Sequence, residues 1–325
     1  MNSCDISVII PVKNRAQLLR RTLDNLLSQS KKPDEIIVID DHSTDDFKLV
    51  VFDYITECTF LNNKGTGPGA ARNLGLSVAN GRYIQFFDSD DLLSKDKLKA
   101  QFEAMESSGA DMAYGPYVKA SEQNDGSWKQ EDVVMQAFPI PSNHSLAEWM
   151  LRGWNALTQA CLFRRTFLDK VPLWDEKLIT HEDYLYLYRL SLKKPSLVHV
   201  PGEGVLYRQH GTQSTDLSTV NTSRGRDQME VLTRLREVLP DDADFWSQQY
   251  LKGRMAMQLS WLQKNGVDTR PYLGYISSLD SIWQWPYRLY NRNMRKATGS
   301  AWEPMHGVSK DPSYFQYIAN SIIYG

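Results

Sequence analysis

The stretch Tyr83-Ile84-Gln85-Phe86-Phe87-Asp88-Ser89-Asp90-Asp91 joins a short apolar run to three carboxylates within four residues. The apolar run, residues 83–87, is typical of a buried strand. Carboxylates at the end of such a strand require water, a cation or another partner. Asp88 and Asp90 lie two residues apart, so an extended chain would place both on one side. A hard divalent cation suits this pair and would keep coordination positions free for a substrate phosphate.

A helix start is the alternative explanation for these acids, because acidic residues often cap the helix that follows a strand. Ser94 is the better candidate for that cap, since the helical period covers residues 95–108. We therefore predict a metal site at Asp88 and Asp90, and a helix that begins near Ser94.

The composition indicates a globular protein with a substantial core. The chain has 325 residues, which is enough for one large or two modest domains. Hydrophobic residues make up 42% and charged residues 23% of it. The formal net charge of −2 gives no general attraction to nucleic acid, so no nucleic-acid partner is expected.

The cysteines and the apolar runs indicate a cytoplasmic protein. Cys4, Cys58 and Cys161 are far apart and odd in number, which favours reduced thiols over a disulfide framework or a zinc site. No apolar run reaches 18 residues, so we expect no membrane-spanning helix. The run at residues 6–12 is too short for a signal peptide and lacks a basic leader.

Strands and helices alternate over the first 110 residues. We predict strands at residues 6–10, 35–39, 59–61 and 83–87, and helices at 15–28, 45–55, 70–79 and 95–108. This alternation indicates an α/β fold with a mostly parallel sheet and helices on both faces. Acidic or glycine-rich turns follow the strands at their carboxyl ends, where open sheets of this kind bind ligands.

The loop at residues 65–69 is rich in glycine and precedes a predicted helix. Gly65-x-Gly67-x-x-Ala70 resembles the dinucleotide fingerprint, but it follows the third strand and not the first, so we reject that interpretation. Such a loop can still hold a phosphate through its backbone N–H groups. Arg72 follows in the first helical turn, where a ligand contact and a surface ion pair both remain open.

The second half of the chain has a different pattern. We predict strands at residues 111–118, 158–163, 196–200 and 204–207, a polar hairpin at 121–128, and helices at 146–151 and 181–190. Glu182 and Asp183 begin the last of these helices, and compensation of the helix dipole alone would explain them. Residues beyond 221 read as helical and polar, without a strand signal.

Five motifs make the chain resemble family 2 glycosyltransferases with the GT-A fold. They are Pro11-Val12-Lys13-Asn14, Asp40-Asp41-His42-Ser43-Thr44-Asp45, Gly69-Ala70-Ala71-Arg72-Asn73, Asp88-Ser89-Asp90-Asp91 and Glu182-Asp183. The resemblance covers about residues 5–215. It implies a Rossmann-like catalytic domain at residues 1–215, with a nucleotide-binding half at 1–110 and an acceptor half at 111–215. Residues 216–325 would then form an added helical region.

The resemblance implies inverting transfer of one sugar from a nucleotide-diphosphate sugar to an acceptor hydroxyl. On this basis Pro11 and Val12 contact the base through their backbone, and Asn14 belongs to the same donor-binding turn. Asp41 accepts the uracil N3–H, which makes a UDP-sugar the expected donor. Arg72 contacts the donor region.

The resemblance also implies a metal and a catalytic base. Mn²⁺ or Mg²⁺ would bind Asp90 directly, with Asp88 nearer the ribose or a metal-bound water. Asp183 would be the base, assisted by Glu182. His210 resembles a histidine that some relatives place at the metal or the diphosphate, and an ordinary buried histidine is the alternative.

Two features of the chain bear on its acceptor. It has no Gln-x-x-Arg-Trp motif and no expected spanning helix, which favours a single transfer over processive polymerisation. A glycan or a lipid-linked molecule in polysaccharide biosynthesis is the expected acceptor. The loops around Trp128, Trp154 and Trp174 would choose it, and these rings either stack on sugars or fill the core.

Two other functions remain open. A nucleotidyltransferase that makes nucleotide sugars would also use an α/β sheet and a metal, but residues 11–14 lack the glycine-rich phosphate loop expected after its first strand. A non-catalytic sugar-binding scaffold could keep the same fold, although the joint presence of Asp88, Asp90 and Asp183 argues against it.

The end of the chain interleaves aromatic and basic residues. This suits a peripheral contact with the inner face of a membrane. A helix packed on the catalytic domain or on a partner chain is the alternative, so an oligomer also remains open. The residues concerned are Trp283, Trp285, Tyr287, Arg288, Tyr290, Arg292, Arg295 and Lys296.

Overall fold

The computed structural model describes residues 4–123, 128–140, 145–151, 157–210, 222–241 and 243–275. The first half contains β1 (Ile6–Val12), α1 (Ala16–Leu27), β2 (Glu35–Asp40), α2 (Phe47–Tyr54), β3 (Thr59–Asn62), α3 (Gly67–Val78), β4 (Tyr83–Phe86), β5 (Leu92–Leu93) and α4 (Lys97–Ser108). The second half contains β6 (Met112–Tyr114), β7 (Tyr117–Glu122), β8 (Trp128–Met135), α5 (Leu146–Leu151), η1 (Thr158–Ala160), β9 (Cys161–Arg164), α6 (Arg165–Leu168), α7 (Glu182–Ser191), β10 (Leu197–His199) and β11 (Val205–Arg208). Helices α8 (Thr222–Glu237) and α9 (Phe245–Lys264) and the 3₁₀ segment η2 (Arg270–Tyr275) follow.

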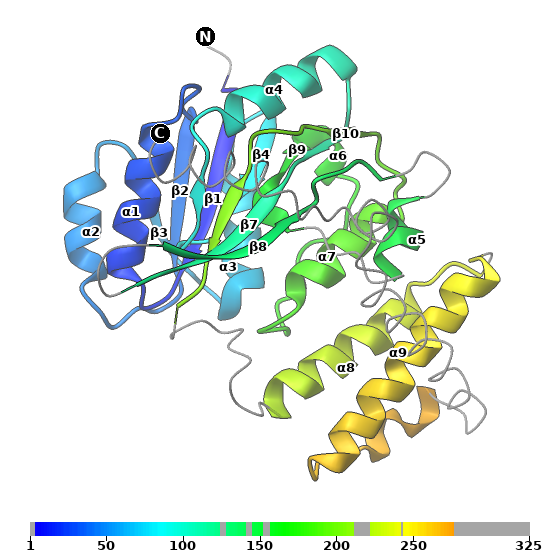
Figure 1. The fold of residues 1–325 in the computed structure, drawn as a ribbon. Helices are drawn as coiled ribbons and strands as arrows, with labels where there is room; N and C mark the ends of the chain where they lie inside the picture. The colour runs from blue at the N-terminus through cyan, green and yellow to red at the C-terminus, as the bar shows by residue number, and fades with distance from the viewer. Residues whose placement is uncertain are drawn as a thin grey trace.

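A seven-stranded sheet with the order β10-β6-β9-β4-β1-β2-β3 forms the centre of the molecule. Every neighbouring pair is parallel except those of β9, which runs antiparallel to both β4 and β6. The predicted mostly parallel sheet is therefore confirmed (Figure 1). The carboxyl ends of β1, β2 and β4 meet at one edge, because parallel strands end on the same side.

Helices cover both faces of this sheet, and the side-chain alternation of β1 explains why. Ile9 belongs to a hydrophobic core that it shares with buried residues of α3, α6 and α7. Val8 and Ile10 belong to a second core, shared with α1, α2 and α4. Because successive strand residues point to opposite faces, one apolar strand contributes to both cores.

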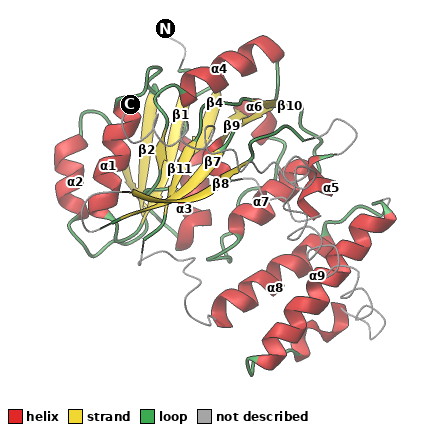
Figure 2. Cartoon of the chain, viewed as in Figure 1, coloured by secondary structure: helices red, strands yellow, loops and turns green. Residues whose placement is uncertain are grey.

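A second, four-stranded sheet has the order β5-β11-β7-β8; the strands of both sheets are yellow in Figure 2. The chain passes from the first sheet to the second at residues 115–116, where the single strand predicted over residues 111–118 is in fact two strands, β6 and β7. A Cβ atom on Gly115 would lie 2.8 Å from the carbonyl oxygen of Val200, so this crossing requires glycine. Pro116 then removes a backbone donor, which explains the interruption.

Several other predicted boundaries were wrong, among them the following three. Pro11 does not end the first strand, since β1 continues to Val12 in parallel register with β2. Helix α3 begins at Gly67 rather than at Ala70. Ser94 does not cap the next helix, because its Oγ accepts a hydrogen bond from Gly204 N at 2.9 Å and α4 begins only at Lys97.

The added helical region is confirmed as far as it is described. Helix α8 packs against α9 and α7, and α9 also contacts α5, on the side of α7 away from the sheet (Figure 1). The domain boundary predicted at residue 215 stays a prediction, because it falls outside the described residues. Residues 276–325, with the aromatic and basic segment that includes Trp283, Tyr290 and Arg295, also lie outside them. None of the described helices combines the length and the apolar character needed to cross a bilayer.

Candidate active site

A cavity of about 960 Å³ lies at the carboxyl ends of β1, β2 and β4. It is bounded by the turns that follow these strands, by the start of α3 and by the start of α7. Nine of the predicted site residues line it: Pro11, Val12, Asp41, Arg72, Asp88, Asp90, Glu182, Asp183 and His210. Residues separated by almost 200 positions therefore meet in one place.

Asp41 is held at one end of this cavity by backbone and side-chain donors. Its Oδ1 accepts hydrogen bonds from Asn63 Nδ2 at 2.7 Å and from Gly67 N at 3.0 Å. Gly67 has a φ of +87° and is the first residue of α3, so the buried carboxylate lies at a helix N-terminus. Oδ2 is 3.4 Å from Lys13 Nζ. The carboxylate is thus fixed in position before any ligand arrives.

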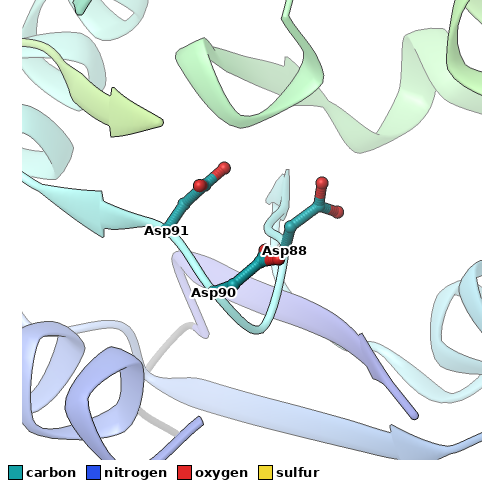
Figure 3. A group of neighbouring side chains, drawn as sticks. All are labelled: Asp88, Asp90 and Asp91. Atoms are coloured by element: carbon teal, nitrogen blue, oxygen red, sulfur yellow. The ribbon is translucent and has the colours of Figure 1, made fainter. Parts of the chain in front are cut away.

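The three aspartates that follow β4 lie close together (Figure 3). One oxygen from each of Asp88, Asp90 and Asp91 lies within 4.8 Å of the other two. Asp91 is fully buried and accepts a hydrogen bond from Arg208 N at 3.0 Å. Burial and then the charge of Asp88 raise the pKa of Asp91 well above its usual range. Asp88 and Asp90 line the cavity, whereas Asp91 is not among its lining residues.

This arrangement fits a hard divalent cation, as the sequence predicts. Asp88 and Asp90 offer carboxylate oxygens on the cavity side, which are the ligands that Mn²⁺ and Mg²⁺ prefer. His210 Nε2 lies 3.0 Å from Asp90 Oδ2. Burial, with the charges of Arg15 and Arg208, lowers the pKa of His210 to about 4. The imidazole is therefore neutral at pH 7, the form in which it can bind a metal.

Arg72 joins the metal motif to the start of α7. Its guanidinium is buried, and donates from Nη1 to Glu182 Oε1 at 2.7 Å and from Nη2 to Asp88 Oδ1 at 2.8 Å. The guanidinium also lies 4.5 Å above the Trp174 ring. Of the two interpretations left open for Arg72, the ion pair is present, but its partners are acids of the site and not surface residues.

Glu182 and Asp183 differ in their surroundings although they are neighbours. Glu182 is buried and bound by Arg72, and burial raises its pKa to about 7 although Arg72 opposes the shift. Asp183 is less buried, and its Oδ1 accepts a hydrogen bond from Tyr184 N at 2.7 Å. Burial also raises the pKa of Asp183, and Arg72 again opposes it. Asp183 is thus the more accessible of the two acids.

The sequence model for glycosyl transferase family 2 matches residues 7–171. The chain belongs to glycosyl transferase family 2. The match covers the motifs of Asp41, Arg72 and Asp88, and the resemblance drawn from the sequence is confirmed. It ends before Glu182, Asp183 and His210, whose place in the site comes from the structure.

Individual relatives agree with this family. Over 125 residues the chain is 40% identical to an uncharacterized glycosyltransferase of Rickettsia conorii. The matched stretch covers 38% of this chain and 21% of that protein. The matches to the first curated relatives span only 21–22% of their length.

Two solved structures share the fold. S. aureus TarS residues 1–349 with UDP-GlcNAc has a TM-score of 0.61 at 18% identity, over 97% of this chain and 91% of that one. The mannosyltransferase PcManGT of Pyrobaculum calidifontis with GDP-Man and Mn²⁺ has a TM-score of 0.53 at 15% identity, over 97% and 85%. The fold of this family 2 member is therefore of the GT-A type.

Other predicted residues of this family 2 protein lie away from the cavity or outside the described part. Asn14 is not among the described residues that line it; its Oδ1 accepts a hydrogen bond from Thr44 N at 2.7 Å, which joins the turn after β1 to the turn after β2. Its donor-binding role stays a prediction. Trp174 is core, stacked on Tyr186 with ring centroids 4.1 Å apart. The side chain of Trp128 and all of Trp154 lie outside the described residues.

Sequence reasoning missed two residues that contact the predicted metal ligands. Arg15 forms an ion pair with Asp90, and Gln159 donates from Nε2 to Asp88 Oδ2. Arg15 follows the first motif directly, and that position was its one signal. Gln159 had none, because it lies in a segment that reads only as a strand and that folds as the 3₁₀ turn η1.

Proposed function

We propose that this protein is an inverting, metal-dependent glycosyltransferase that moves one sugar from a UDP-sugar to an acceptor hydroxyl. The observation that carries the proposal is that Asp41, the pair Asp88 and Asp90, and Asp183 all line the same cavity. These side chains supply the three functions needed. Asp41 recognises the nucleotide base, Asp88 and Asp90 bind the metal that accompanies the diphosphate, and Asp183 is the catalytic base that takes the proton of the acceptor.

The donor assignment rests on Asp41. A carboxylate accepts hydrogen bonds only, so it suits the N3–H of uracil. The TarS complex contains UDP-GlcNAc, which agrees with a uridine donor, whereas the PcManGT complex contains GDP-Man. The uridine assignment therefore rests on the resemblance of the Asp40–Asp45 motif to that of uridine-binding family members, and the nature of the sugar is left to the assay.

Asp90 and Asp88 would hold the Mn²⁺ or Mg²⁺, with His210 as a neutral nitrogen beside Asp90. When bound, the ion supplies positive charge that neutralises the leaving diphosphate. Ion pairs with Arg15 and Arg72 already balance part of the negative charge of Asp90 and Asp88.

Asp183 acts on the acceptor. As the acceptor oxygen attacks the anomeric carbon, its proton passes to the Asp183 carboxylate. The bond between the anomeric carbon and the diphosphate oxygen breaks, and its electron pair leaves with the UDP. A single displacement of this kind inverts the anomeric centre and requires no nucleophile from the enzyme. Glu182, held by Arg72, positions the start of α7.

A cytoplasmic glycan or a lipid-linked molecule is the acceptor class that we propose. A lipid-linked acceptor would require contact with the inner face of the membrane, and the basic and aromatic segment around Trp283 and Arg295 would supply it. Liposome flotation with anionic lipid tests this role, and absence of co-flotation would end it. Gel filtration with light scattering tests whether the segment instead joins two copies.

A screen of nucleotides tests the donor. UDP with Mn²⁺ should raise the melting temperature more than GDP, ADP or CMP, because a ligand that binds only the folded state stabilises it. Equal shifts for all four would remove the uridine assignment. Radiolabelled UDP-sugars with a panel of acceptors then test transfer. Formation of a nucleotide sugar from a nucleoside triphosphate and a sugar phosphate would instead favour a nucleotidyltransferase. Binding of a UDP-sugar without any turnover would favour a non-catalytic sugar-binding scaffold.

A further inference from the structure

A second, smaller cavity of about 150 Å³ lies between α7, α8 and α9. It shares His181 and Asp183 with the large cavity, so the proposed base lines both. The other residues that line it are Tyr184, Gln228, Val231, Leu232 and Arg254. The donor side of the large cavity is made by the sheet, whereas this cavity is made by the added helices.

Arg254 is held in the wall of the small cavity by α7. Its Nη1 donates to the Tyr184 hydroxyl at 2.7 Å, and its guanidinium lies 5.1 Å from the Tyr184 ring. The hydroxyl in turn donates to Met150 O at 2.6 Å. This hydrogen bond therefore connects helix α9, although it lies outside the family match, to the helix that carries Asp183. A guanidinium fixed in this way is suited to bind an oxyanion.

The charges around this junction favour a negatively charged ligand. Arg254 lines the small cavity and Arg224 lines the large one. Desolvation lowers the pKa of the half-buried His181, and the charges of Arg224 and Arg254 lower it further against the opposing charge of Asp227. His181 is neutral at pH 7 as a result, with its pKa lowered to about 4. Asp227 on α8 is occupied by Thr180, whose Oγ1 donates to Asp227 Oδ2 at 2.9 Å. Asp183 is the one acid among the described residues that line the small cavity.

We propose that the small cavity is an acceptor subsite that binds an anionic group, a phosphate or a carboxylate, carried near the hydroxyl that Asp183 deprotonates. The inference rests on the proposed function, because it takes Asp183 as the base. Arg254 binds the oxyanion, Gln228 provides an amide donor beside it, and Arg224 attracts the acceptor at the entrance. The cavity has room for one small charged group and not for a sugar chain, so the remainder of the acceptor extends into the large cavity.

Binding of small probes to the UDP- and Mn²⁺-loaded protein tests this subsite, because UDP fills the diphosphate site. The probes are sn-glycerol 3-phosphate, glycerate and glycerol, titrated by calorimetry. We expect saturable binding of an anionic probe and none of glycerol, and the two anions distinguish a phosphate-bearing from a carboxylate-bearing acceptor. Arg254→Gln should weaken that binding about 10- to 100-fold, the effect of losing a hydrogen bond to a charged group.

Two controls separate charge from structure. Arg254→Lys keeps the charge and should restore part of the affinity, and Arg226→Gln removes an equal charge from an exposed position on α8 and should change nothing. Equal binding of glycerol, absence of saturable anion binding, or an Arg254→Gln variant with unchanged affinity would overturn the subsite. Normal UDP affinity in that experiment would leave the proposed function intact, and failure of the wild-type protein to bind UDP would overturn the proposed function itself.

Discussion

Arg72 donates from Nη1 to Glu182 Oε1 at 2.7 Å, and its second terminal nitrogen reaches Asp88 Oδ1 at 2.8 Å. One buried cation on α3 thus connects the turn after β4, where the metal would bind, to the first turn of α7, which carries Asp183. A planar guanidinium can serve two carboxylates at once, which an ammonium group cannot do with the same geometry. We infer that Arg72 sets the separation of metal and base.

Replacement of Arg72 should shift the pH dependence of catalysis. Arg72 lowers the pKa of Asp183 against the effect of burial, so Arg72→Gln should raise that pKa. A base with a higher pKa stays protonated to a higher pH, and the acid limb of the kcat/KM profile should move upward. Arg72→Lys should move it less. Arg82→Gln, at a half-exposed surface ion pair, is the control, and an acid limb that stays in place in Arg72→Gln would contradict this role.

Replacement of Asp183 tests the base directly. Asp183→Asn keeps the size of the side chain but is a far weaker base, so turnover should fall by about 10²-fold or more. UDP–Mn²⁺ affinity and the circular dichroism spectrum should be nearly unchanged. Glu182→Gln should lose less turnover, because its proposed role is to hold α7. Near-normal turnover in Asp183→Asn would return Asp183 to a helix-capping role.

The strands and most of the site could be predicted because their signals are local. Each strand of the nucleotide-binding half is a short apolar run, and the acid or glycine that follows it marks the carboxyl edge of the sheet. Parallel pairing then requires Val12, Asp41 and Asp88 to lie near one another. The sequence alone therefore predicted that the residues after β1, β2 and β4 lie together at one edge of the sheet.

The contacts across the site could not be predicted because they join residues far apart in the chain. The sequence contains no sign that Arg72 would face Glu182, 110 positions later, or that Gln159 would reach Asp88. The antiparallel course of β9 reverses the direction of the chain beside β4, and only tertiary packing determines it. The prediction that Ser94 caps a helix was wrong for the same reason, because its hydroxyl accepts a hydrogen bond from the backbone N–H of the distant Gly204.

Replacement of Asp90 tests the metal. Asp90→Asn removes a negative charge that would face the ion, so UDP affinity should fall by at least about tenfold with Mn²⁺ present and change little in EDTA. Titrations of UDP and of Mn²⁺ with the same protein measure both effects. Asp96→Asn, at an exposed position just before α4, should bind both like the wild type. If the wild-type protein binds UDP equally with Mn²⁺ and with EDTA, the metal site is wrong.

Lys97 provides a test of the buried polar contacts that connect the core to Asp88. Its side chain is fully buried, and its Nζ contacts Gln85 Oε1. Gln85 in turn donates from Nε2 to the backbone carbonyls of Phe86 at 2.7 Å and of Gln159 at 3.0 Å, and the Gln159 side chain donates to Asp88. Burial lowers the pKa of Lys97 from 10.5 to about 7.

The depressed pKa of Lys97 makes stability depend on pH above neutrality. Between about pH 7 and 10.5 the unfolded chain holds the Lys97 proton and the folded chain does not, so unfolding takes up a proton. The free energy of unfolding should therefore rise with pH in that range, by up to about 1.4 kcal/mol per pH unit from this group. Urea unfolding at pH 7.5, 8.5 and 9.5 measures the slope. Lys97→Met should flatten it by that amount, whereas Lys99→Met, at an exposed position on the same helix, should keep it. Parallel slopes for the wild-type protein and Lys97→Met would mean that Lys97 keeps its proton when folded, with Gln85 as sufficient compensation for the buried charge.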